Sequence, residues 1–200
     1  MSEQEEVGED YRDAVLTNQE WAGRRFARCD FTDADLRGLN SRNCTFTECD
    51  FTRADLGESG HRASGFQSCT FDRTVLTGSD WQDCTLVGSA FTDCRLRPIT
   101  LRETDLTLVS LGGAALRGVT LSGLRLREAN LTGSDLREAD LRDADLRGAR
   151  LSETRLDGAD LRGAKVDGVA LAQAALTGAQ VDIDTALAYA AAMGLRVHLG

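Results

Sequence analysis

A five-residue period runs through most of this chain and limits the folds that are open to it. From Phe26 to Val181, every fifth residue belongs to one frame without an insertion, and 30 of these 32 positions hold Leu, Phe, Val or Trp. Ser41 and His61 are the two exceptions. A period of five fits neither the 3.6-residue α-helix nor the two-residue strand. It indicates a chain that turns a corner every five residues.

A second column, mostly of small residues, lies two positions before each large one. It begins Cys29, Ala34, Leu39 and Cys44, and all six cysteines of the chain fall in it. One large and one small inward residue in every five suit a coil whose centre is filled by the large side chain. No Cys-x-x-Cys pair occurs, so the cysteines are interpreted as reduced core residues rather than zinc ligands.

A longer period of 20 residues sets the size of the coil. Phenylalanine recurs at this spacing in two columns of the frame, which predicts four sides per coil and about eight coils. In such a stack each coil touches only its neighbours, and like residues pack on like. The predicted core ladder comprises Phe26, Phe31, Phe46, Phe51, Phe66, Phe71 and Phe91.

The repeating unit resembles that of a known family. Ala-Asp-Leu-Arg-Gly stands at 144–148 and again at 159–163, and is similar to the unit of the pentapeptide-repeat proteins. That resemblance implies an all-β solenoid, a right-handed quadrilateral β-helix. The irregular stretches 58–62, 94–98, 108–113 and 181–194 are similar to those of the mycobacterial fluoroquinolone-resistance members.

The composition of the ends suggests three segments. Residues 1–20 are rich in carboxylates, and we expect an acidic N-terminal extension that is disordered to about residue 15, followed by a cap. Residues 21–181 form the repeat β-helix. In residues 182–200, Asp182 or Asp184 is expected to cap a helix over 185–193 that ends at Gly194, followed by a short strand over 195–199.

This C-terminal module has two interpretations. It could simply cover the open end of the β-helix, which would otherwise expose unpaired backbone. The resemblance implies instead a homodimer formed head to head. The apolar residues available for that interface are Leu187, Met193, Leu195, Val197 and Leu199.

The charge balance excludes several classes of function. The net charge is −9, and no basic stripe is present that would neutralise phosphates, so direct nucleic-acid binding is not expected. No apolar run reaches the ~18 residues of a membrane span, and the acidic N-terminus does not resemble a secretory signal. We therefore expect a cytoplasmic protein without membrane contact. No motif for a metal or an organic cofactor is present, so none is expected.

The resemblance implies that the protein binds DNA gyrase by imitating DNA, inhibits or modulates it and protects it from fluoroquinolones. The implied target is either the DNA gate or the ATPase-domain channel, and the sequence does not choose between them. The densest run of carboxylates, at Asp135, Glu138, Asp140, Asp143 and Asp145, is the candidate binding face, with ordinary solvated surface as the alternative.

Two other classes of function compete with gyrase binding. One is a passive scaffold that binds another protein. The other is an enzyme built on Ser41 and His61, which would occupy adjacent coils. A nucleophile also needs an orienting group and an oxyanion site in a cleft, and a filled coil offers none, so we do not expect an enzyme.

Overall fold

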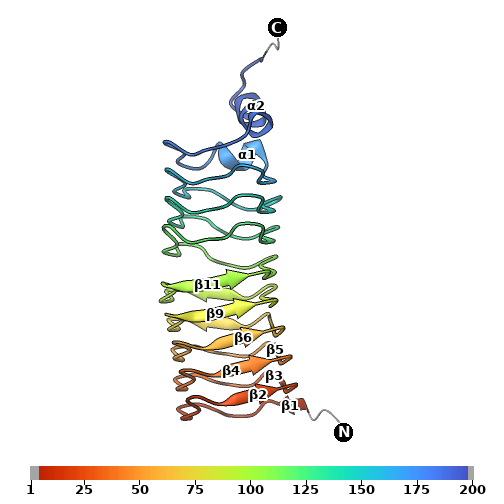
Figure 1. Cartoon of the computed structure of the whole chain (residues 1–200), viewed down its shortest axis with the longest axis vertical. Coiled ribbons are helices and arrows are strands. Elements are labelled where there is room, and N and C mark those ends of the chain that lie inside the picture. The colour runs from red at the N-terminus through yellow and green to blue at the C-terminus, as the bar shows by residue number, and fades with distance from the viewer. Residues whose placement is uncertain (1–4, 198–200) are drawn as a thin grey trace. The chain divides into compact units, whose positions relative to one another are not determined.

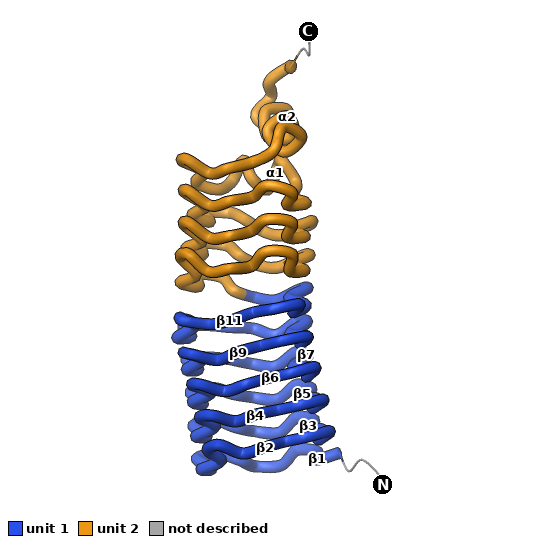
Figure 2. Tube along the Cα trace, in the orientation of Figure 1, with its two compact units in different colours: residues 1–110 blue, residues 111–200 orange. Residues whose placement is uncertain are grey.

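The structure is a computed structural model that describes residues 5–197. It divides into two compact units, unit 1 over residues 1–110 and unit 2 over residues 111–200 (Figure 2). Each unit is a parallel β-solenoid with the same 20-residue register. At 20 residues per coil, unit 1 contains about five coils and unit 2 about three and a half before its last helix.

Unit 1 carries the regular strands, and every pairing between them is parallel. A four-stranded sheet has the order β1-β3-β5-β7, and a five-stranded sheet the order β11-β9-β6-β4-β2 (Figure 1). A third side contains the pair β8 and β10. The fourth side is connected by single bridges such as Asp35↔Asp55. The strands are β1 Glu5–Val7, β2 Glu20–Ala22, β3 Arg25–Ala27, β4 Asn40–Arg42, β5 Thr45–Thr47, β6 Gly60–Arg62, β7 Gly65–Gln67, β8 Thr70–Asp72, β9 Ser79–Gln82, β10 Ala90–Thr92 and β11 Ile99–Arg102.

The core of unit 1 is the predicted phenylalanine ladder, and all seven of its members are buried. Phe31 stacks on Phe51 with ring centroids 5.0 Å apart and planes 3° from parallel. Phe46 stacks on Phe66 at 4.4 Å. Because residues 20 apart are hydrogen-bonded neighbours, each aromatic side chain meets its equivalent in the next coil. The ladder and the 20-residue coil period are therefore confirmed.

The corners of the coils explain the glycine, asparagine and aspartate in the repeat. The second residue after most inward positions has a left-handed backbone, such as Arg28 with φ 54° and Gly118 with φ 67°. A non-glycine residue there costs roughly 1–2 kcal/mol. This cost favours glycine, and also asparagine and aspartate, whose side chains bond to the local backbone.

The N-terminal segment differs from the prediction of a disordered extension. β1 pairs with β3 in register, so the first coil already begins at Glu5. The five-residue frame continues back through Trp21, Leu16 and Tyr11, and the Tyr11 ring stacks on Phe31 at 4.8 Å. The prediction of disorder is therefore wrong for the described residues from Glu5 onward, because the high charge of the segment obscured a frame that is intact.

The open end of this first coil is closed by an ion pair. Glu6 occupies an inward frame position and holds Arg24 at 2.7 Å. The Arg24 guanidinium lies 4.7 Å from the ring centroids of both Trp21 and Phe26. Tyr11 donates a hydrogen bond to the same carboxylate. A cation over aromatic faces thus covers apolar rings that would otherwise meet solvent.

Unit 2 continues the repeat with isolated bridges and ends in two helices. α1 spans Gly168–Leu171, and α2 spans Ile183–Ala192. Asp182 caps α2 by accepting a hydrogen bond from the Thr185 amide at 3.1 Å, and Gly194 has φ 80°, as expected for a helix stop. The predicted helix is confirmed, with its start moved to Ile183.

The strand predicted over residues 195–199 is not formed in its described part, residues 195–197. Leu199 lies outside the described residues. A strand needs a neighbour to satisfy its backbone groups, and no described segment pairs with residues 195–197. α1 was not predicted, because Val166 and Leu171 keep the five-residue frame while the backbone between them turns helical.

Candidate functional site

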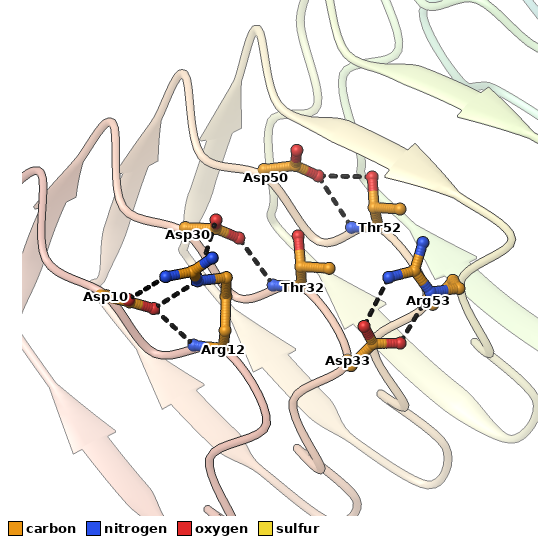
Figure 3. Close-up of polar contacts among 8 residues, drawn as sticks. All are labelled: Asp10, Arg12, Asp30, Thr32, Asp33, Asp50, Thr52 and Arg53. Atoms are coloured by element: carbon orange, nitrogen blue, oxygen red, sulfur yellow. Dashed lines mark hydrogen bonds and ion pairs between the residues drawn. The ribbon is translucent and has the colours of Figure 1, made fainter.

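One side of unit 1 collects carboxylates from successive coils. Parallel bridges join Asp10 to Asp30 and Asp30 to Asp50, which places the three in one column (Figure 3). Together with the corner that follows it, this side carries seven aspartates and three arginines, an excess of four negative charges. We call it the aspartate face, and its charged residues are Asp10, Arg12, Asp13, Asp30, Asp33, Asp50, Arg53, Asp72, Arg73 and Asp93.

Local turn chemistry orients two carboxylates of this column. Asp30 Oδ1 accepts a hydrogen bond from the Thr32 amide at 2.9 Å. Asp50 Oδ1 accepts one from the Thr52 amide at 2.8 Å and a second from the Thr52 hydroxyl at 2.6 Å. Such turns fix the side chain through one oxygen and leave Oδ2 outside the turn. The repeat therefore presents carboxylates at the regular spacing of the coils, about 4.8 Å.

The arginines of the aspartate face make ion pairs with it. The Arg12 guanidinium donates to both oxygens of Asp10, at 2.9 and 2.6 Å, and this contact lowers the pKa of Asp10 to about 2. Arg53 donates to Asp33 at 2.7 Å and holds the pKa of that carboxyl below its usual range. Arg73 pairs with Asp72 at 2.9 Å, and Arg12 also approaches Asp30 at 3.7 Å. The excess of four negative charges therefore belongs mainly to Asp13, Asp30, Asp50 and Asp93.

The acidic run predicted as the binding face does not form one face. Asp135, Asp140 and Asp145 bridge to Ala115, Thr120 and Arg125 respectively, which places them on three successive sides of the coil. A single side collects residues that are 20 apart, so a dense run of acids is spread around the coil.

Arginines also neutralise most of that run. Asp140 pairs with Arg142 at 2.7 Å, and Glu138 with Arg117 at 2.6 Å. Asp135 and Asp145 pair in the same way with Arg137 and Arg147. No ion pair to Asp143 is seen among the described residues. The alternative of ordinary solvated surface therefore describes this run better. Sequence reasoning missed the aspartate face, although the recurrence of aspartate at 10, 30 and 50 was available as a signal.

The Ser41–His61 contact forms a buried polar network. His61 is 2% exposed, its Nδ1 lies 2.8 Å from Ser41 Oγ, and its Nε2 lies 2.9 Å from Ser59 Oγ. Ser64 donates to the Arg62 carbonyl at 3.0 Å, and Ser41 Oγ lies 3.2 Å from Ser64 Oγ. Both ring nitrogens of His61 therefore have a hydroxyl partner.

Ser41 and His61 are both almost completely buried in this network, at 3% and 2% exposure. Burial lowers the pKa of His61 to about 3, which keeps the ring neutral. His61 is therefore a hydrogen-bonded polar residue inside the coil.

The remaining candidate residues lie as follows. All six cysteines are free, and five are buried. No cluster of three or more His, Cys, Asp or Glu side chains that could hold a metal ion occurs among the described residues. Of the proposed dimer contacts, Leu187 is half-buried, whereas Met193, Leu195 and Val197 are exposed. No helix in the described part of the chain is long and apolar enough to cross a membrane.

Comparison with known proteins decides the family. The family model for pentapeptide repeats matches eight copies, over residues 25–59, 69–107, 84–123, 125–163 and 154–181. The chain belongs to the pentapeptide-repeat family. Its quadrilateral β-helix accounts for the four sides and the 20-residue register seen in both units.

Solved structures of other pentapeptide-repeat proteins share this fold. A trypsin-treated form of QnrB1, a plasmid-mediated fluoroquinolone resistance protein, matches with a TM-score of 0.66 and 21% identity over 96% of this chain and 97% of that one. Full-length QnrB1 matches with a TM-score of 0.65 and 20% identity over 95% and 97%. No curated protein gave a match to the sequence. At this identity the likeness shows the fold.

Proposed function

We propose that this pentapeptide-repeat protein binds DNA gyrase in place of DNA, through the aspartate face of unit 1. The observation that carries the proposal is the column Asp10, Asp30 and Asp50, whose members repeat at the coil spacing. Each strand of duplex DNA carries one phosphate per 3.4 Å of helix axis, and a protein that binds it releases counterions. A column of carboxylates about 4.8 Å apart offers a basic channel a comparable charge density.

The similarity to QnrB1 supports a link to fluoroquinolones. QnrB1 is a plasmid-mediated fluoroquinolone resistance protein, and its fold covers almost the whole of this chain. A protein that occupies the DNA-binding channel of gyrase would reduce the amount of cleaved DNA that the drug can trap. We propose that protection or inhibition of gyrase follows from this competition, in the cytoplasm where the enzyme works. Binding to isolated gyrase fragments would distinguish the DNA gate from the ATPase-domain channel.

We also propose that the protein acts as a homodimer through its C-terminal module. Ile183, Met193, Leu195 and Val197 are all large apolar residues, and each is at least 47% exposed. Such a group of exposed apolar side chains close together in sequence is typical of an interaction site. A second copy of this chain would cover them.

The test is DNA supercoiling by purified gyrase, with the protein titrated in. The variant is Asp30→Asn with Asp50→Asn, because asparagine keeps the Oδ1 that accepts the Thr32 and Thr52 amides while it removes the charge. The matched control is Asp140→Asn with Asp160→Asn, which removes the same charge from aspartates paired with arginines in unit 2.

We expect the wild type and the control to inhibit supercoiling at similar concentrations, and the variant to need about tenfold more protein. Equal inhibition by all three proteins would remove the aspartate face from the proposal. No inhibition by the wild type would contradict gyrase binding and favour a scaffold that binds another protein.

A further inference from the structure

A groove lies on the five-stranded sheet of unit 1, on a different side of the coil from the aspartate face. Its volume is about 200 Å³. Liquid water occupies about 30 Å³ per molecule, so the groove has room for a small organic molecule. It is lined by Glu20, Asn40, Ser41, Arg42, Gly60, His61, Arg62, Asp80 and Gln82. We call it the Gly60 groove.

The groove exists because one residue of the sheet lacks a side chain. Asn40, Gly60 and Asp80 are neighbours in one outward column, by the registers of β4 with β6 and β6 with β9. A Cβ on Gly60 would lie 2.6 Å from Asn40 Oδ1, so the Asn40 side chain leans over the glycine. Gly60 does not have a left-handed backbone, so its glycine is not required by the turn.

Two oxygen atoms at the groove accept no hydrogen bond from a described residue. Asp80 Oδ2 pairs with Arg102 at 2.7 Å, but Asp80 Oδ1 is buried and accepts no hydrogen bond from any described residue. Asn40 uses its Nδ2 to donate to Glu20 at 3.1 Å and to the Gly38 carbonyl at 3.2 Å, which orients Oδ1 toward Gly60. A buried carboxylate oxygen without a donor is costly and rare in native proteins.

Two arginines lie two residues further along the same strands as Asn40 and Gly60. Arg42 and Arg62 are direct register partners on β4 and β6, and both are exposed. Within residues 5–197, neither makes an ion pair. Like charges directly opposite each other on neighbouring strands are destabilising. An anion bound between Arg42 and Arg62 would relieve this repulsion.

We propose that the Gly60 groove binds a small zwitterion. Its anionic group, a carboxylate or phosphate, lies between Arg42 and Arg62. Its ammonium group donates to Asn40 Oδ1 above Gly60, next to the Asp80 carboxylate. The two columns are separated by two residues along the strand, about 6.6 Å, which sets the spacing of the two charges. This site lies apart from the aspartate face and is independent of the proposed gyrase binding.

The test is titration of the full ¹⁵N-labelled protein, followed by the amide signals of Gly60, His61 and Arg62. The probe is γ-aminobutyrate, because its three methylenes let its two charges approach the required spacing. Butyrate and butylamine each carry one of the two charges, and glycine carries both too close together. We expect γ-aminobutyrate to shift these signals in the millimolar range or below, and the other three to bind at least about tenfold more weakly.

Three variants and a control test the assignment. Arg62→Gln and Asp80→Asn each remove one end of the site, and Gly60→Ala fills it at the cost of a small movement of the Asn40 side chain. Each should weaken γ-aminobutyrate binding about tenfold. Arg28→Gln removes an exposed arginine from another side of the coil and should leave binding unchanged.

Three results would overturn the proposal. The first is the absence of any shift at about 20 mM γ-aminobutyrate, a concentration that would reveal even weak binding. The second is binding of butyrate as tight as that of γ-aminobutyrate. The third is binding of γ-aminobutyrate that persists in a variant carrying both Gly60→Ala and Arg62→Gln. The amide spectrum outside the groove shows whether each variant is folded. If the glycine or arginine variant is misfolded, the affinity of Asp80→Asn for γ-aminobutyrate decides whether the proposal holds.

Discussion

At the scale of single residues, Gly168 shows how closely α2 packs on unit 2. A Cβ at this position would lie 2.4 Å from the Ala188 carbonyl oxygen and 3.0 Å from the Tyr189 amide nitrogen. These are backbone atoms of α2 and cannot rotate away. Gly118 has the opposite character, with φ 67° and no atom within 4 Å of a built Cβ. Gly168 is therefore required because there is no space for a side chain, whereas Gly118 is favoured because its backbone is left-handed.

We predict that Gly168→Ala displaces α2, whereas Gly118→Ala does not. Overpacking against rigid backbone costs about 1–3 kcal/mol and must move α2, whereas the backbone strain at Gly118 costs roughly 1–2 kcal/mol and stays local. Amide hydrogen exchange should show loss of protection in residues 185–192 for Gly168→Ala only. Unchanged protection of α2 in that variant would mean that the helix does not rest on Gly168.

His61 makes stability depend on pH. Its pKa is about 3 in the folded protein because the ring is buried, while an exposed histidine has a pKa of 6.5. The unfolded state therefore binds one more proton between these values. The stabilising contribution of neutral His61 is complete above pH 6.5 and is lost as the pH falls toward 3, by up to about 1.4 kcal/mol per pH unit.

The matching prediction compares the wild type with His61→Phe. Carboxylates titrate in both proteins, so the difference between their free energies of unfolding isolates the histidine. Urea denaturation at several pH values should show the wild type losing stability faster than His61→Phe between pH 6.5 and 4. Parallel curves would show that His61 is not buried in its neutral form.

At the scale of elements, the aromatic ladder of unit 1 joins each coil to the next. Phe51 is fully buried and stacks between Phe31 and Phe71, with both centroid distances at 5.0 Å. Leucine occupies the equivalent inward position on the neighbouring side, at Leu56, so a smaller residue is compatible with the coil. The ladder adds contact between coils that leucine alone does not supply.

We predict that Phe51→Ala lowers the free energy of unfolding by about 3–5 kcal/mol, and Phe51→Leu by about 1–2 kcal/mol. The loss arises from a cavity that the rigid backbone ladder cannot close. Urea denaturation followed by circular dichroism measures both. A loss below about 1 kcal/mol for Phe51→Ala would indicate that the coils collapse around the cavity.

The elements also show what the sequence could predict. The ladder was predictable because aromatic identity repeats every 20 residues from Phe31 to Phe91. The same register indicates the aspartate face at 10, 30 and 50, whereas the dense acids at 135–145 lie on successive sides of the coil. The first coil was missed because Glu6 places a charge at an inward position. The Gly60 groove depends on where the Asn40 side chain leans, which no sequence pattern contains.

At the scale of the whole molecule, the exposed apolar residues after α2 predict self-association. Leu195 and Val197 are 63% and 47% exposed. Leu195→Asp with Val197→Asp would place charges in an apolar interface, which such an interface does not tolerate. Sedimentation should show a dimer for the wild type and a monomer for the double variant. A double variant that still sediments as a dimer would place the interface elsewhere.

The charge of the whole molecule carries the central claim, that it replaces DNA on gyrase. Its net charge is −9, and the aspartate face concentrates part of it. Binding that depends on such charges weakens steeply with salt, because screening and counterion release both oppose it. If binding depended on apolar contacts instead, its dissociation constant would change little with salt concentration.

The most direct test is therefore the dissociation constant for gyrase between 50 and 200 mM salt. It would be measured for the wild type and for Asp30→Asn with Asp50→Asn. The account predicts that the wild type weakens at least about tenfold over this range, with a shallower slope for the variant. A dissociation constant that changes less than about twofold in the wild type would contradict DNA mimicry.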